Sequence, residues 1–72
     1  MTQAIRIDDR DNVAVALLPL AGGSSVLGVT LAEDIPAGHK FALHAIRSGS
    51  AVIKYGHPIG AAARNIAAGE WV

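Results

Sequence analysis

The stretch Ile35-Pro36-Ala37-Gly38-His39-Lys40-Phe41 contains the turn pattern that decides the predicted fold. An apolar residue is followed after two residues by glycine, and after two more by another apolar residue. The same spacing recurs at residues 20–26, 46–52 and 66–72. The offsets between successive copies are 15, 11 and 20 residues, which is too uneven for a regular solenoid. The pattern therefore predicts one kind of turn used four times.

Each copy is interpreted as a strand end, a type I turn and a return strand. Two small residues fill the centre of the turn, and Pro36 suits the first central position because its ring presets φ. The glycine then takes a position where the backbone needs positive φ. Three-residue hairpin loops with a glycine bulge follow this logic. The predicted structural turn glycines are Gly23, Gly38, Gly49 and Gly69.

Short apolar runs between the turns predict strands. Residues 13–18 carry β-branched side chains at alternate positions, although their alanines and leucines also permit a short helix capped by Asp11 or Asn12. The other predicted strands are residues 26–31, 41–44, 51–55 and 59–63, with a loop at 19–25. The sequence thus predicts an all-β fold with little or no helix, and some open strand edges that invite partners.

The length of the chain sets what it can do by itself. It has 72 residues, of which 51% are apolar and 4% aromatic. A folded monomer of this size exposes about 4,200 Å² and buries roughly 60% of its unfolded surface. This predicts a single domain, residues 1–72, with one thin core and no deep catalytic pocket. Catalysis is therefore expected only as a domain or subunit of something larger.

Charge and cysteine content exclude several classes of function. Six basic residues balance six acidic ones, so no nucleic-acid contact is expected. The zero net charge favours docking or self-association, and a homo-oligomer is one expected form. The absence of cysteine excludes disulfides and thiolate sites. The longest apolar run is too short to span a bilayer and follows three aspartates, so we expect no membrane contact and a cytoplasmic protein.

Four segments resemble the amino-terminal domain of the altronate dehydratase family. They are residues 11–17 (DNVAVAL), 38–43 (GHKFAL), 52–56 (VIKYG) with 58–60 (PIG), and 66–70 (IAAGE). The second of these resembles the most distinctive segment of the family. Galactarate dehydratase and the small subunit of sulfolactate sulfo-lyase carry similar domains. The resemblance extends from about Ile5 to Val72, and all four segments agree in order and spacing.

This resemblance implies an SAF-type β-clip, a long hairpin folded back on itself, in agreement with the four-turn interpretation. It implies a domain or small subunit of a sugar-acid dehydratase, inactive alone and partnered by a large catalytic domain or subunit. A divalent metal is expected in that catalytic partner, and no cofactor within this chain. Two alternatives stay open: a small subunit of sulfolactate sulfo-lyase, or a non-catalytic module for ligand binding or docking.

His39 and Lys40 place an imidazole next to a cation directly after one predicted turn. Such a pair can bind a sugar-acid carboxylate or move a proton. His39 is therefore the candidate catalytic residue and Lys40 a candidate substrate contact. Strand alternation sends neighbouring side chains to opposite faces unless the turn is bulged. A solvated turn pair is the alternative interpretation.

Lys54 and Tyr55 supply a second cation and a phenol, and are also candidate substrate contacts. Dehydration of a hydroxy acid passes through an enediolate-like intermediate, whose carboxylate must be held by cations or a metal. Lys40 and Lys54 are the two lysines of the chain. Their stems can equally cover apolar surface while the amines stay in water. His44 and His57 lack metal-ligand spacing, so no metal site is expected in this chain.

Two further polar or aromatic features have more than one interpretation. Acidic and basic residues alternate across residues 6–11, which is typical of a solvated turn. Asp11 and Asn12 are expected to fix a turn through side-chain bonds to the backbone. Trp71 either closes the small core or anchors an interface.

Overall fold

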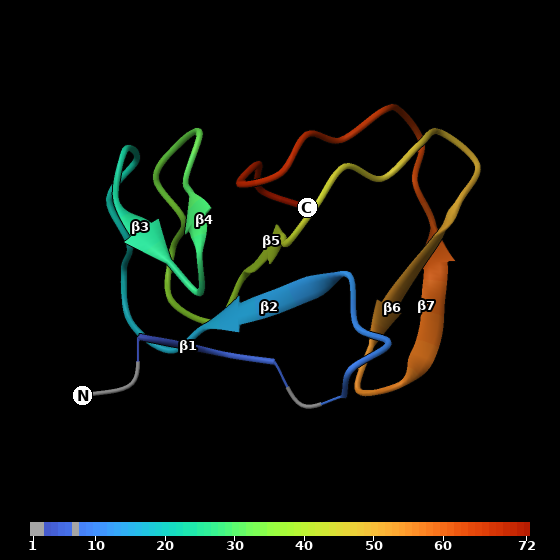
Figure 1. The fold of residues 1–72 in the computed structure, drawn as a ribbon, viewed down its shortest axis with the longest axis horizontal. Helices are drawn as coiled ribbons and strands as arrows, with labels where there is room; N and C mark the ends of the chain where they lie inside the picture. The colour runs from blue at the N-terminus through green and yellow to red at the C-terminus, as the bar shows by residue number, and fades with distance from the viewer. Residues whose placement is uncertain (1–2, 7) are drawn as a thin grey trace.

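The computed structural model describes residues 3–6 and 8–72, and these residues form seven short strands and no helix (Figure 1). The strands are β1 (Ala4–Ile5), β2 (Val13–Ala16), β3 (Ser25–Val26), β4 (Val29–Thr30), β5 (Lys40–Ala42), β6 (Ala51–Lys54) and β7 (His57–Ala61). This confirms the predicted all-β class. The described part of the chain has no helix long and apolar enough to cross a membrane.

The strands form three small antiparallel sheets. The central sheet has the order β1-β2-β5, and hairpins β3–β4 and β6–β7 form the other two. In Figure 1 the two hairpins flank the central sheet on opposite sides. The register of β2 and β5 runs without a shift, with Val13 opposite Ala42 and Val15 opposite Lys40. Strand β2 is the middle strand of the central sheet, which lies between the two hairpins.

Two predicted strands contain or end at a tight turn. The run 26–31 is a hairpin rather than one strand, because Leu27 and Gly28 have positive φ of 51° and 76°. The run 51–55 ends as a strand at Lys54, because Tyr55 and Gly56 have φ of 54° and 75°. Two consecutive positive φ values in a two-residue connection are typical of a type I′ turn.

The other predicted strands are present in the structure, but their first and last residues differ from the prediction. Of the predicted run 13–18, residues 13–16 form β2, so the helix alternative is wrong. Strand β5 begins one residue before the predicted run 41–44, and β7 begins two residues before the run 59–63. Strand β3 begins at the last residue of the predicted loop 19–25.

The four repeated turns need glycine, as predicted, but their type differs from the prediction. Gly23, Gly38, Gly49 and Gly69 have φ of 87°, 82°, 83° and 84°. The His39 N–H donates to the Pro36 carbonyl at 3.2 Å, so the turn comprises residues 36–39. Pro36 is its first residue and does not occupy either of the two central positions. The glycine is then the third residue, where a type II turn requires positive φ.

These turns pair with one another instead of closing hairpins, which corrects the predicted hairpin loops. Leu20 and Ile35 exchange two backbone hydrogen bonds of 2.9 Å, and Ile46 and Ile66 exchange two of 2.8 Å. The first pair brackets hairpin β3–β4 and the second brackets hairpin β6–β7. The chain thus uses one hairpin-and-turn unit twice, and the longer second hairpin explains the uneven offsets.

In each pair of turns, a side-chain oxygen next to one turn accepts a hydrogen bond from the backbone of the other turn. Asp34 Oδ1 accepts the Gly22 N–H, and Asn65 Oδ1 accepts the Ser48 N–H, both at 2.8 Å. Each acceptor stands directly before the second apolar residue of its pair. The correspondence extends to these side chains, so the two halves share more than the spacing of their glycines.

The buried apolar residues form two clusters in place of the single core predicted. One contains Ala4, Ala14, Ala16, Leu20, Val26, Leu31, Ile35 and Phe41, and the other contains Val13, Ala42, Ile46, Val52, Ala62 and Ile66. Each cluster therefore lies beneath one turn pair and its hairpin. Successive side chains of a strand point to opposite faces, so β2 contributes to both clusters.

Candidate functional site

Lys54 and Tyr55 lie together at the tip of hairpin β6–β7. The Lys54 Nζ is 4.9 Å from the centroid of the Tyr55 ring, within the range of a cation–π contact. Lys54 is half-buried and Tyr55 is exposed. The tip thus places an ammonium and a phenol side by side at the surface.

Two buried polar side chains hold this hairpin in place. Asp11 Oδ1 accepts the Gly56 N–H at 2.7 Å. Asn12 Nδ2 donates to the Ala51 carbonyl at 2.9 Å, and its Oδ1 accepts the Ile53 N–H at 2.7 Å. The Asn12 side chain therefore satisfies two backbone groups of β6 that a neighbouring strand would otherwise bind, next to the bulge between Val52 and Ile53.

These contacts confirm that Asp11 and Asn12 bind backbone groups, but the anchored turn is distant in sequence. Gly56 lies 45 residues beyond Asp11. Both Asp11 and Asn12 are buried, so the interpretation of a solvated turn is wrong for Asp11. Residues 8–11 do form a turn, in which the Asp11 N–H donates to the Asp8 carbonyl at 3.0 Å.

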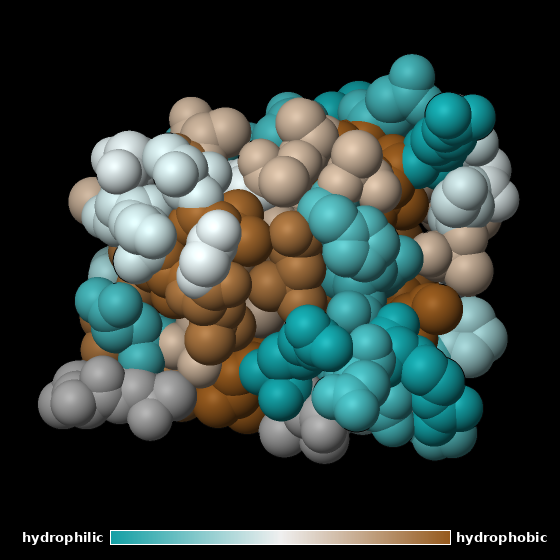
Figure 2. Space-filling model, viewed as in Figure 1, coloured by the Kyte–Doolittle hydropathy of each residue, from teal (hydrophilic) through white to brown (hydrophobic). Residues whose placement is uncertain are grey.

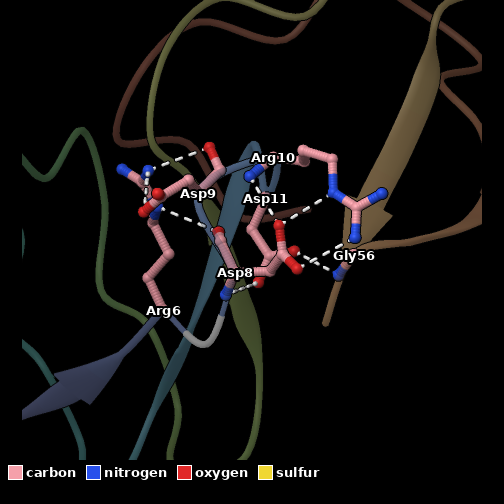
Figure 3. Close-up of polar contacts among 6 residues, drawn as sticks. All are labelled: Arg6, Asp8, Asp9, Arg10, Asp11 and Gly56. Atoms are coloured by element: carbon pink, nitrogen blue, oxygen red, sulfur yellow. Dashed lines mark hydrogen bonds and ion pairs between the residues drawn. The ribbon is translucent and has the colours of Figure 1, made fainter.

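An ion pair between Asp8 and Arg10 packs against the same tip (Figure 3). Arg10 Nε and Nη2 donate to the two Asp8 carboxylate oxygens at 3.0 Å each. The pKa of Asp8 is lowered to about 2, first by the Arg10 side-chain hydrogen bonds and then by the Arg10 backbone N–H. A Cβ added at Gly56 would lie 2.7 Å from Asp8 Oδ2, so the pair contacts the turn directly.

His39 and Lys40 lie beside the other end of β2. Lys40 begins β5 opposite Val15, and the His39 carbonyl accepts the Ala16 N–H at 2.9 Å. Gly38 and His39 both lie opposite Ala16, because Gly38 N–H donates to the Ala16 carbonyl at 2.8 Å, and this is the predicted glycine bulge.

From His39 onward the alternation is regular: Trp71 pairs with Phe41 and also contacts His39, so Lys40, between them, points to the other face. The His39 ring contacts the Trp71 indole edge-on, with centroids 4.9 Å apart. His39 and Lys40 therefore do not converge on one contact point.

The two candidate pairs are separated along β2. Lys40 lies opposite Val15, whereas the Tyr55 tip is anchored by Asp11, four residues earlier in the chain. Within β2 alone, the two steps from Val13 to Val15 span roughly 7 Å. Of the residues predicted from the sequence, the structure thus brings together Lys54 and Tyr55, whereas His39 and Lys40 lie elsewhere and on opposite faces.

Two other kinds of site are not found in the described part of the chain. Residues 3–6 and 8–72 contain no group of three His, Cys, Asp or Glu side chains arranged to hold a metal ion. They also enclose no pocket. The candidate residues are instead half-buried or exposed on the surface.

Comparison with known proteins identifies the family. Residues 2–72 match the altronate/galactarate dehydratase SAF domain. The chain belongs to this family. It is 55% identical over 74 residues to the altronate dehydratase of Escherichia coli (strain K12), and 36% identical over 76 residues to that of Bacillus subtilis (strain 168). It is 41% identical over 71 residues to the galactarate dehydratase (L-threo-forming) of E. coli (strain K12).

These relatives are much longer than the chain. The matches cover 97%, 100% and 94% of the chain, but 15%, 15% and 14% of the three relatives. The family resemblance seen in the four segments is therefore confirmed, and so is the β-clip, SAF-like fold that it implied. The chain corresponds to a small part of each relative.

Proposed function

We propose that this chain is a domain of a larger sugar-acid dehydratase, and that the enzyme acts on a hexonic acid such as altronate. The observation that carries this proposal is the 55% identity to altronate dehydratase over 97% of the chain. The identity to galactarate dehydratase is lower, at 41%. Most of each relative's length lies outside the match, and we assign the bulk of the chemistry to that catalytic region.

The reaction defines what the domain must bind. A proton leaves the carbon next to the carboxylate, hydroxide leaves the neighbouring carbon as water after protonation, and the resulting enol becomes a 2-keto-3-deoxy acid. Negative charge develops on the enediolate-like intermediate, so cations close to the carboxylate lower the barrier. The described residues offer lysines and no clustered metal ligands, and we therefore place the divalent metal expected from the family on the catalytic region.

Lys54 and Tyr55 are the substrate contacts that the geometry supports best. The Lys54 amine binds the carboxylate, and the Tyr55 hydroxyl binds a hydroxyl of the sugar acid. Their hairpin tip is held by buried hydrogen bonds from Asp11 and Asn12, which fixes the position of both groups before substrate arrives. His39, as the group that moves a proton, and Lys40, as a further cation, act separately beside the other end of β2, because their side chains point to opposite faces.

The proposal is tested with the whole enzyme that carries this chain. We expect it to convert altronate to a 2-keto-3-deoxy acid faster than it converts galactarate, and the 72-residue chain alone to be inactive. Release of sulfite from sulfolactate, without dehydration of either sugar acid, would overturn the proposal.

The site assignment is tested separately by removing one charge at a time. Loss of a charged hydrogen bond to the carboxylate predicts a fall in kcat/KM of about 10- to 100-fold for Lys54→Met. Lys40→Met and His39→Asn test the roles of these two residues separately in the same assay. Arg47→Met, which removes an exposed cation in the third repeated turn, is the matched control. Wild-type kcat/KM in both lysine variants would reject the assignment.

A further inference from the structure

The tip of hairpin β3–β4 has the same backbone geometry as the Lys54–Tyr55 tip of hairpin β6–β7, but different side chains. Leu27 and Gly28 have φ of 51° and 76°, close to the 54° and 75° of Tyr55 and Gly56. A type I′ turn favours Asn, Asp or Gly at its first central position, because a bulky side chain is disfavoured at positive φ. Leucine at this position is therefore a local conflict that the turn itself does not explain.

The core does not explain it either, because Leu27 is 53% exposed. Leu17, just past the end of β2, is 49% exposed. Figure 2 shows apolar residues gathered on this face, over hairpin β3–β4 and the end of β2. Val26 and Ala16 belong to one core cluster, so the tip and the strand end cover the same core. Large apolar side chains left in water on one face are typical of a docking surface.

We propose that the Leu27 tip docks against an apolar surface of the catalytic region of the enzyme that carries this domain. The inference rests on the proposed function. A sugar acid carries hydroxyls and a carboxylate, so an exposed leucine suits protein and not substrate. The two hairpin tips thereby have different roles: Lys54 and Tyr55 contact the substrate, and Leu27 contacts the catalytic region.

The size of the catalytic region favours it, over a second copy of this domain, as the partner of the Leu27 tip. The chain matches 14–15% of the length of its relatives, so the catalytic region is far larger than the domain. Domains of one chain typically share about 600–1,500 Å² of interface. A contact between the Leu27 tips of two copies buries two side-chain ends, well below the roughly 1,000 Å² of a stable dimer.

A cross-linking experiment identifies the occupant directly. The chain has no cysteine, so Leu27→Cys introduces the one attachment point of this domain for a maleimide–benzophenone photo-cross-linker, in a whole enzyme whose cysteines outside the domain are replaced by serine. We expect peptides cross-linked between residue 27 and the catalytic region. Ile59→Cys on β7, at a residue 50% exposed, is the matched control and is expected to give none with the same catalytic segment. Cross-links to a second copy of this domain, or none from residue 27, would overturn the proposal.

Hydrogen exchange separates docking from a purely structural role of Leu27. Asparagine suits the first position of a type I′ turn, so Leu27→Asn keeps or improves the fold of the hairpin. In the whole enzyme we expect amides 26–29 to exchange about tenfold faster in this variant than in the wild type, because docking protection is lost. Unchanged or slower exchange would indicate a structural role only. Cross-linking in an enzyme that fails to dehydrate altronate rejects the proposed function alone, whereas an active enzyme without cross-links rejects the docking alone.

Discussion

Asp11 Oδ1 accepts the Gly56 backbone N–H at 2.7 Å, although the two residues are 45 positions apart in the sequence. The carboxylate is buried, and the turn that it anchors exposes Tyr55 to solvent. Asn12 adds two more hydrogen bonds to the same hairpin. A buried polar pair before β2 thus sets the position of the exposed candidate contacts Lys54 and Tyr55.

Removing the Asp11 carboxylate should destabilise the chain. Asp11→Ala leaves the Gly56 N–H without this partner, which predicts a loss of about 1–3 kcal/mol in the free energy of unfolding. Urea unfolding of the 72-residue chain measures it. Asp9→Ala is the control, because the Asp9 side chain is fully exposed and its 3.7 Å ion pair with Arg6 is weak, so its effect should stay within about 0.5 kcal/mol. Equal losses in the two variants would contradict the anchoring role.

Two turn glycines with nearly the same φ should respond differently to alanine. Gly38 and Gly69 have φ of 82° and 84°, so each alanine variant carries the same backbone strain of about 1–2 kcal/mol. A Cβ at Gly38 meets open space, whereas at Gly69 it collides with the Thr30 carbonyl oxygen. We expect Gly69→Ala to lower the unfolding midpoint in urea at least twice as far as Gly38→Ala. Similar midpoints would show that the close approach of Gly69 and Thr30 is relaxed at no cost.

The ion pair between Asp8 and Arg10 should give the chain a specific acid sensitivity. The folded-state pKa of Asp8 is about 2, below its ordinary value of 3.8. A lowered carboxyl pKa stabilises the fold above the ordinary value, and this contribution is lost as the pH falls through the folded value. We therefore expect stability to decline between about pH 4 and pH 2, and Arg10→Gln to make this decline shallower while lowering stability at neutral pH.

Thermal unfolding at a series of pH values measures this effect. Arg47→Gln removes an exposed cation elsewhere and serves as the control, with the same slope as the wild type between pH 4 and pH 2. An unchanged slope in Arg10→Gln would show that other carboxyl groups account for the acid loss.

The sequence predicted the features that depend on local backbone geometry. The four glycines could be recognised because positive φ selects glycine strongly, and Asp11 and Asn12 because their side chains readily bind backbone groups. The pairing of Leu20 with Ile35, and of Ile46 with Ile66, could not be recognised, since it joins turns 15 and 20 residues apart through backbone groups.

The missed features are those in which local preference and structure disagree. Leu27 lies in a turn that disfavours leucine, so residues 26–31 resemble a continuous strand in the sequence. The adjacency of His39 and Lys40 suggested one contact point, but the bulge ends at His39 and regular alternation after it sends the two side chains to opposite faces. The signal for the first error was Gly28, which follows a large apolar residue exactly as Gly56 follows Tyr55.

The last prediction uses this turn geometry to separate structure from binding at Tyr55. Asparagine suits φ of 54°, so Tyr55→Asn should leave the stability of the hairpin equal or higher. The same change removes the phenol and the ring that lies under the Lys54 amine. If Tyr55 contacts the sugar acid, the KM of the whole enzyme for altronate should rise about tenfold, the equivalent of one lost hydrogen bond.

Tyr55→Phe distinguishes the two ways in which Tyr55 can act. It keeps the ring for Lys54 and removes only the hydroxyl. A rise in KM shared by both variants assigns the effect to the hydroxyl, whereas a wild-type KM in Tyr55→Phe assigns it to the placement of Lys54. A wild-type KM in Tyr55→Asn, in an enzyme whose thermal unfolding is unchanged, would remove Tyr55 from the site and leave Lys54 as the only contact at this tip.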